Sequence, residues 1–225
     1  MNSFTFFFTS SIGRKWVVGL TGLALVGFVL GHLIGNLQVF LGPEPLNRYG
    51  HFLQGLGELL WAIRLGLLAM VVLHILFTIK LRLESRSARP DRYAVRKYRA
   101  ASWAGRWMVW SGLMVLSFII FHLLHFTTQT IDPNFKTLID AEGRHDIYRM
   151  MIAGFRNPLA SGFYIVAVGL LGVHLNHGFQ SMFQTLGLNS HKVAPLISRS
   201  GQALSWLIFL GYASIPAAVL SGLVK

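Results

Sequence analysis

Residues 16–43, WVVGLTGLALVGFVLGHLIGNLQVFLGP, form an uncharged stretch of 28 residues that decides the fold of this chain. A helix of about 20 apolar residues crosses the roughly 30 Å hydrocarbon core of a membrane, so the stretch predicts a transmembrane helix. It is too long for the apolar part of a cleavable signal peptide. The whole chain agrees, because 53% of its 225 residues are hydrophobic and only 12% are charged. A soluble domain usually carries about twice that share of charge.

Four further uncharged stretches follow along the chain. Residues 107–131, 157–191 and 200–224 are each long enough to span a membrane. The run 65–79 is shorter, so its helix must include interfacial turns, with Arg64 extending toward the surface. We predict an all-α integral membrane protein with a single domain, 1–225, and five transmembrane helices, at about 14–40, 56–83, 103–128, 158–185 and 200–223.

The basic residues predict how these helices are oriented. One side of the membrane would hold 13 Lys and Arg residues, nine of them between Lys80 and Arg106, with only two acidic residues. The other side would hold seven basic and six acidic residues. Because cytoplasmic loops carry the excess of Lys and Arg, we predict a multi-pass protein of the cell inner membrane with a cytoplasmic N-terminus and an external C-terminus. The basic segment 80–106 also suits docking of a soluble partner or of anionic lipid.

Histidines are concentrated in the predicted helices, where an ionisable side chain is costly and marks a functional site. Four consecutive helices supply imidazoles, which favours a bundle of four helices that holds haem between its members. The chain has no cysteine, which excludes thiolate-held iron–sulfur clusters and covalently attached haem, so we expect b-type haem. The six histidines are His32, His74, His122, His125, His174 and His177.

Depth along each helix pairs four of these histidines. Counted at about 1.5 Å per residue from the flanking charges, His32 and His122 lie in the outer half of the membrane, and His74 and His174 lie in the inner half. We therefore predict two haem b groups, each with iron held by two axial imidazoles. The outer pair is His32 and His122, and the inner pair is His74 and His174. Together they would conduct electrons across the bilayer.

Helical spacing alone leaves two ligands open, because His125 and His177 each lie one turn beyond a paired histidine. Gly27, Gly31 and Gly35 recur every four residues beside His32 and suit the close approach of a flat cofactor, although such glycines also serve ordinary packing between membrane helices. Aromatic residues near the predicted helix ends indicate the membrane interfaces. They are Trp16, Trp61, Trp103, Trp107, Trp110 and Tyr164.

A series of short motifs gives the chain a family resemblance over nearly its whole length. It resembles the di-haem cytochrome b membrane anchor of succinate:quinone oxidoreductases and fumarate reductases, of the type with five helices in one subunit. Each motif is weak alone, but their order, their placement on helices and the short basic second loop are together specific. The motifs are SIGRKWVVGLTG at 11–22, GHLIGN at 31–36, LNRYGHF at 46–52, VLH at 72–74, IFHL at 120–123, GFYIV at 162–166 and VHLNHG at 173–178.

The resemblance implies roles for particular residues. It places the axial ligands on His122 and His174, which leaves His125 and His177 as candidates for hydrogen bonds to haem propionates or to the ligands. Ser11 and Arg14 are similar to a Ser/Arg pair that related anchors use for quinone at the inner face. Candidates for a quinone site at the outer face are Tyr49, His51 and Glu58.

The resemblance also implies partners and an activity. Such an anchor carries a flavoprotein with FAD and an iron–sulfur protein on the cytoplasmic face, and passes electrons between the iron–sulfur subunit and a membrane quinone, with menaquinone favoured. This subunit would then catalyse at most the quinone half-reaction. Two alternatives remain open: a stand-alone transmembrane di-haem reductase, and a haem-free transporter with a histidine relay. No carboxylate lies deep in a predicted span, which disfavours a proton or zinc carrier.

Overall fold

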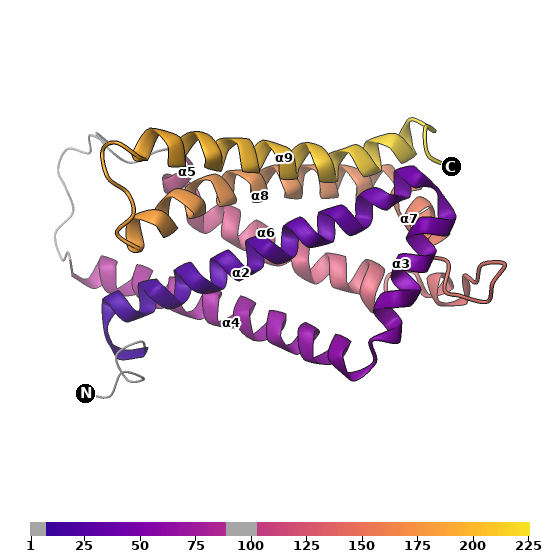
Figure 1. Ribbon diagram of the computed structural model, residues 1–225, viewed down its shortest axis with the longest axis horizontal. Helices are drawn as coiled ribbons and strands as arrows, with labels where there is room; N and C mark the ends of the chain where they lie inside the picture. The colour runs from indigo at the N-terminus through magenta and orange to yellow at the C-terminus, as the bar shows by residue number, and fades with distance from the viewer. Residues whose placement is uncertain (1–7, 89–102) are drawn as a thin grey trace.

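The computed structural model describes residues 8–88 and 103–225 (Figure 1). It confirms the prediction of an all-α membrane protein, because five of its helices are long and apolar enough to cross a membrane. These spans are Ser11–Leu41, Glu58–Ser87, Met108–Thr127, Pro158–Thr185 and Ala194–Leu220. No strand occurs within the described residues, where the one β-bridge pairs Ile139 with His145.

The spans are built from the following elements. The first is α2 (Ser11–Leu37), which continues into the short 3-10 helix η1 (Gln38–Leu41), and the second is α4 (Glu58–Ser87). The third consists of α6 (Met108–His122) and a π-helical turn, η2 (Leu123–Thr127), preceded by the single turn α5 (Trp103–Arg106). The last two are α8 (Pro158–Thr185), which has the predicted bounds, and α9 (Ala194–Leu220).

Two helices begin before their predicted first residues for local reasons. The sequence analysis expected the first helix at residue 14, but Ser10 caps α2, its hydroxyl accepting a hydrogen bond from the Gly13 N–H at 2.9 Å. Such a cap satisfies one of the unpaired N–H groups at a helix start. The fifth helix begins at Ala194, six residues earlier than expected, and Pro195 lies in its first turn, where a missing N–H costs nothing.

One end of the bundle carries extra structure that the sequence analysis did not resolve. We call residues 38–57 and 128–157 the outer cap, after the side of the membrane on which the charge distribution predicts them. It contains α3 (Pro43–Gly55), η3 (Pro133–Thr137) and α7 (Ile147–Arg156). In Figure 1 the cap lies at the end of the bundle where α9 finishes, opposite the end where α2 begins. The cap and the adjacent helix ends share a buried apolar cluster of Val39, Leu46, Met151, Ile152, Phe155, Tyr164, Ile215 and Val219.

The helices pack in pairs, with α2 along α4, α6 along α8, and α8 along α9 (Figure 1). Helix α9 also contacts α2, where the Tyr212 hydroxyl donates a hydrogen bond to the Val29 carbonyl at 2.7 Å. At the same contact, a Cβ added to Gly211 would lie 2.9 Å from Cδ2 of Leu33, so a larger residue there would require the Leu33 side chain to shift. Helix α4 has no buried residue, so its apolar side chains remain for lipid.

Candidate functional site

The two predicted outer ligands lie opposite one another between α2 and α6. The ring centroids of His32 and His122 are 5.8 Å apart, and the rings are inclined at 81°. A metal–imidazole bond is about 2.0–2.1 Å long, so two opposed imidazoles on one metal ion have their ring centres roughly 6 Å apart. The observed separation of the two ring centres is close to this value.

Aromatic side chains surround this outer pair. Phe28 stacks on His32 one turn earlier in α2, with centroids 5.3 Å apart and an interplanar angle of 17°. Phe118 likewise lies one turn before His122 in α6, with centroids 5.8 Å apart, but its ring is tilted by 34° rather than stacked. The ring of Tyr212, from α9, lies 6.3 Å from that of His32. These rings give the pair an apolar surrounding, which controls solvent access and the redox potential of a bound metal group.

The inner pair is held by hydrogen bonds whose direction fixes the tautomer of His74. Its Nδ1 lies 3.2 Å from the Val18 carbonyl oxygen and 3.2 Å from Thr21 Oγ1. The Thr21 hydroxyl donates its own hydrogen to the Val17 carbonyl at 2.7 Å. Because a carbonyl oxygen only accepts, Nδ1 of His74 must carry the hydrogen, and a neutral imidazole then has a free lone pair on Nε2.

His174 is held in the same way from α6. Its Nδ1 lies 3.3 Å from Ser111 Oγ, and this hydroxyl lies 3.1 Å from the Met108 carbonyl, to which it donates. The serine oxygen is thus available to accept from Nδ1–H, which again leaves Nε2 unprotonated.

A glycine lies under each inner histidine. A Cβ added to Gly22 would lie 3.3 Å from Cε1 of His74, and one added to Gly112 would lie 3.4 Å from Cε1 of His174. Each glycine follows the hydroxyl residue that holds the same ring, namely Thr21 and Ser111. The hydroxyl, the glycine and the imidazole therefore form one local arrangement that occurs twice.

The sequence analysis missed this arrangement, although a signal for it exists. Thr21 precedes His32 by 11 residues, and Ser111 precedes His122 by the same 11 residues. Helices α2 and α6 also each carry a phenylalanine four residues before this histidine, Phe28 in α2 and Phe118 in α6. A comparison of the two helices at a fixed offset of 90 residues would have revealed both features. At about 1.5 Å per residue, the two levels of the site lie roughly 15 Å apart along α2.

The position of Tyr164 corrects an expectation from the sequence. It was expected at a membrane interface, but its side chain is only 6% exposed and belongs to the core. Its hydroxyl lies 3.3 Å from Nδ1 of His122 and 3.2 Å from Nδ1 of His125. The phenol thus connects a predicted ligand to the histidine that was its alternative.

The four paired histidines fit a haem with two axial imidazoles. Within the described residues, no hydrogen bond involves Nε2 of His32, His74, His122 or His174, and none of these atoms is completely enclosed by protein. Three of the four have their Nδ1 atoms facing protein oxygens, as metal-binding histidines usually do. No group of three or more His, Cys, Asp or Glu side chains gathers anywhere in the part of the chain that is described.

The two remaining intramembrane histidines take different positions. His125 is only 4% exposed and lies among Phe121, Phe126 and Phe135, with its ring centroid 4.1 Å from that of Phe126. The ring that lies against His32 is that of His122. His177 lies one turn beyond His174 on α8 and is half-buried. The roles of these two histidines as hydrogen-bonding partners of a haem remain predictions.

The predicted inner quinone residues do not form a paired site. Arg14 is 6% exposed, and its guanidinium donates to Glu84 at 2.7 Å and to the Thr9 carbonyl at 2.9 Å. Its Nε is buried and makes no hydrogen bond within the described residues. Ser11 is exposed, and the neighbouring Ser10 caps the helix instead. The quinone role of both residues stays a prediction.

The predicted outer quinone residues lie on or beside α3. A Cβ added to Gly35 would lie 2.6 Å from the Tyr49 ring, so this phenol fills the third position of the predicted glycine groove. The other two positions, Gly27 and Gly31, have nothing within 4 Å of an added Cβ. His51 and Glu58 are both exposed. A quinone at these three residues stays a prediction.

An ion-pair network organises the outer cap. The guanidinium of Arg144 bonds the carboxylates of Glu44 and Asp140, with Nε 2.7 Å from Asp140. The hydrogen bond from Arg144 lowers the pKa of Glu44 below its ordinary value. Burial acts to raise the pKa of Asp140, but hydrogen bonds from Arg144 and from the Glu142 N–H outweigh it, and the pKa is lowered. The two carboxylates in turn raise the pKa of Arg144.

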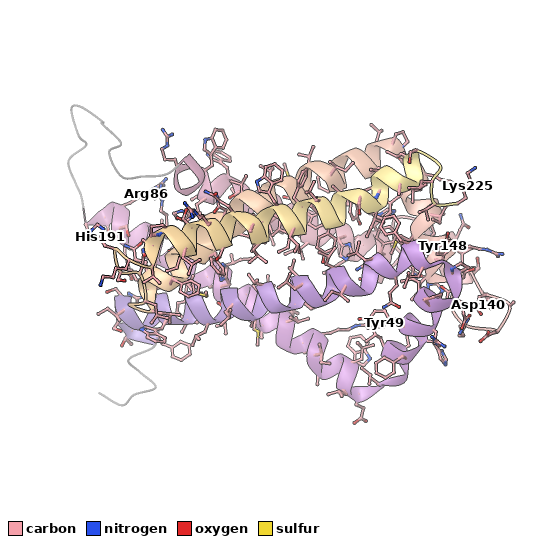
Figure 2. All side chains as sticks on the ribbon, turned by 45° about the horizontal axis from the view of Figure 1, so that its top comes forward. Tyr49, Arg86, Asp140, Tyr148, His191 and Lys225 are labelled. Atoms are coloured by element: carbon pink, nitrogen blue, oxygen red, sulfur yellow. The ribbon has the colours of Figure 1, made fainter. Side chains whose placement is uncertain are left out.

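The opposite end of the bundle is marked in Figure 2 by Arg86 and His191, whereas Asp140, Tyr148 and Lys225 lie at the capped end. Most of the basic segment that was predicted to face the cytoplasm, residues 89–102, lies outside the described residues. The docking role of that segment therefore stays a prediction. Comparison of the chain with models of known protein families, with curated proteins and with solved structures gave no match.

Proposed function

We propose that this protein is a membrane anchor that conducts electrons through two b haems, between a soluble iron–sulfur subunit and a membrane quinone. The observation that carries the proposal is the opposed pair of imidazoles at the outer level, together with two oriented imidazoles at the inner level. The ring centroids of His32 and His122 are 5.8 Å apart. At the inner level, hydrogen bonds to α2 and α6 orient the rings of His74 and His174. A b haem gains and loses one electron at its iron, and two of them offer a path between the two levels.

In this proposal the chain holds each iron between imidazoles that are already oriented. Val18 and Thr21 fix the tautomer of His74, and Ser111 is positioned to accept from His174, so that each Nε2 offers its lone pair. A preformed site avoids the cost of reorienting these side chains when the cofactor binds. The aromatic rings around the outer pair keep water from the metal group and thereby influence its potential.

The partners and the substrate rest on the resemblance of the motifs. We propose that a flavoprotein with FAD and an iron–sulfur protein dock on the cytoplasmic face, where succinate is oxidised or fumarate is reduced. This chain has no cysteine to hold an iron–sulfur cluster, so the clusters must belong to a partner. Its own chemistry is limited to electron transfer and to the exchange of electrons and protons with a quinone such as menaquinone. We place it in the inner membrane, with its N-terminus in the cytoplasm.

The decisive experiment is a haem count on the purified, full-length protein. We expect a reduced b-type spectrum with two haems per chain. A colourless preparation would contradict the proposal and favour the haem-free transporter. Mass spectrometry of proteins that co-purify with the tagged chain tests the partners, and a flavoprotein with a ferredoxin-like subunit is the expected result. Two haems without such partners would favour a stand-alone reductase.

The ligand assignment has controls one turn away on the same helices. We expect His122→Ala and His174→Ala each to remove one haem, whereas His125→Ala and His177→Ala should retain both. Redox titration identifies the haem that is lost, because His32→Ala and His122→Ala should remove the same one, and His74→Ala and His174→Ala the other. The assignment is wrong if His125→Ala loses a haem while His122→Ala keeps two.

A further inference from the structure

We propose that Tyr164 and His125 are positioning residues of the outer pair, in which the Tyr164 hydroxyl accepts a hydrogen bond from Nδ1–H of His122 and donates one to Nδ1 of His125. The inference rests on the proposed function, in which His122 binds a haem iron. Neither residue touches the metal in this arrangement. Both act by fixing the orientation and the electron donation of His122.

The argument begins with the number of hydrogens available. The Tyr164 oxygen lies 3.3 Å from Nδ1 of His122 and 3.2 Å from Nδ1 of His125. A phenol has one hydrogen, so it can donate to only one of these nitrogens and must accept from the other. Two arrangements are therefore possible, and they give the two histidines opposite tautomers.

Metal binding selects one of the two arrangements. An imidazole that binds iron through Nε2 carries its hydrogen on Nδ1, so His122 becomes the donor to the phenol. The phenol hydrogen then points to Nδ1 of His125, which has to be unprotonated. A neutral His125 consequently carries its hydrogen on Nε2. Ligation at His122 thus sets the tautomer of a histidine that is not a ligand.

The surrounding side chains hold the hydrogen-bonded groups of His122, Tyr164 and His125 in place. The Tyr164 ring makes edge-to-face contacts with Phe155 and Phe118, with centroids 5.0 and 5.1 Å away and interplanar angles of 88° in both cases. Cε1 of His125 would lie 3.1 Å from a Cβ added to Gly154. His125 itself belongs to the π-helical turn that directly follows His122, the last residue of α6. Such turns occur frequently at functional sites.

The far side of His125 faces open space. His125 lines a cavity of about 490 Å³ together with Asp132 and several aromatic residues. Its Nε2 makes no hydrogen bond within the described residues and is not among their completely enclosed polar atoms. Asp132 supplies a carboxylate to the same cavity. A hydrogen on Nε2 of His125 would therefore lie beside a cavity that contains an acceptor, which suits the tautomer that ligation requires.

The hydrogen bond to Tyr164 should affect the potential of the outer haem. When a ligand imidazole donates its Nδ1–H to an acceptor, the imidazole becomes a stronger electron donor to the metal. A stronger donor stabilises the oxidised iron and lowers the midpoint potential. Donation by the phenol to His125 strengthens the phenol oxygen as an acceptor, because hydrogen bonds in a chain polarise one another. Removing either residue should raise the outer potential, and removing Tyr164 should have the larger effect.

The test compares three variants of the full-length protein by haem count, redox titration and electron paramagnetic resonance. In Tyr164→Phe we expect two haems and a higher midpoint potential of the outer haem. At a fixed potential, the ratio of oxidised to reduced outer haem should fall by up to about tenfold, which corresponds to about 59 mV for one electron. The resonance of the outer haem should shift, and the inner haem should not change. His125→Phe should give a smaller shift in the same direction. Tyr212→Phe is the matched control, because its hydroxyl bonds a backbone carbonyl although its ring also lies beside a predicted ligand.

Each outcome decides a separate question. An unchanged outer midpoint and spectrum in Tyr164→Phe, with both haems present, overturns this inference and leaves the proposed function intact. An equal shift in Tyr212→Phe also overturns it, because the effect would then be a general loss of packing. If Tyr164→Phe does not retain haem, His125→Phe decides: a shift supports the inference and no shift overturns it. Absence of haem in the unaltered protein contradicts the proposed function itself.

Discussion

The guanidinium of Arg14 in the first turn of α2 lies 2.7 Å from the carboxylate of Glu84 near the end of α4. The arginine is almost completely buried, whereas the glutamate is half-exposed. This ion pair joins two neighbouring spans at the end of the bundle opposite the outer cap. Arg14 was predicted as a quinone residue, and any such role has to coexist with this structural contact.

Glu84→Gln should destabilise the protein, because a buried guanidinium loses its charged partner while its Nε already lacks one. We expect the free energy of unfolding to fall by about 1–3 kcal/mol, which lies between the costs of breaking an exposed ion pair and a fully buried one. Unfolding of the purified protein in detergent measures the change. Glu142→Gln is the control, because Glu142 is an exposed partner of Arg144 at 3.0 Å and should change stability by less than about 0.5 kcal/mol. Equal effects of the two substitutions would refute the structural role of Glu84.

Ser111→Ala should raise the midpoint potential of the inner haem, because His174 loses the oxygen that can accept from its Nδ1. The outer midpoint should stay unchanged. Ser117→Ala is a matched control two turns along on the same helix, where the hydroxyl bonds only the Leu113 carbonyl. Redox titration of both variants provides the measurement. The idea fails if the two substitutions shift the inner midpoint equally.

Asn47→Ala should destabilise the outer cap. The side chain is 2% exposed, donates to Asp146 at 3.1 Å and accepts from the Tyr148 N–H at 3.0 Å. Loss of these bonds leaves buried groups unsatisfied, at a cost of about 2–3 kcal/mol. Thermal unfolding measures the effect. As the control, we chose Asn134→Ala, because Asn134 is exposed and its side chain makes no hydrogen bond within the described residues, so near-normal stability is expected. A stable Asn47→Ala variant would show that the network contributes little.

The outer cap should lose stability in acid. The pKa values of Glu44 and Asp140 are lowered in the folded protein. A carboxyl group with a lowered pKa contributes stability above its unfolded pKa, and that stability disappears as the pH falls through the folded pKa. The ordinary values are 4.5 and 3.8, so protection should be constant near neutral pH and fall below about pH 4.

Hydrogen exchange of residues 138–148, corrected for the intrinsic pH dependence of exchange, measures this loss. Arg144→Gln removes the main hydrogen-bond donor to both carboxylates, so protection in that variant should already be weak at neutral pH and change less on acidification. If Arg144→Gln retains the same acid midpoint as the unaltered protein, Arg144 is not the cause of the pH dependence.

Much of the membrane topology could be read from the chain because its causes are local. A span requires about 20 consecutive residues without charge, in which the backbone satisfies its own hydrogen bonds. Residues 158–185 were predicted with the observed bounds for this reason. The depth of His32 and His122 follows from the constant rise of a helix, and the structure brings their rings together.

Other features of the site could not be read in this way. Tyr164 looked like an interfacial tyrosine, because its position near the start of a span was visible and its burial against α6 was not. The start of the first helix was placed at residue 14, whereas α2 begins at Ser11 because Ser10 caps it. The bounds of α3 and α7 in the outer cap were not predicted, because these helices become stable by packing on the helix ends rather than by their own sequence.

By itself, the sequence determined five membrane-crossing helices and the depth of each histidine, since hydrophobic length and helical rise are properties of one segment at a time. Only the tertiary structure decided which oxygen atoms face His74, His122 and His174, and that His122 rather than His125 lies opposite His32. These relations depend on how each helix is rotated about its axis. That rotation is set by contacts between distant residues, such as Leu33 against Gly211.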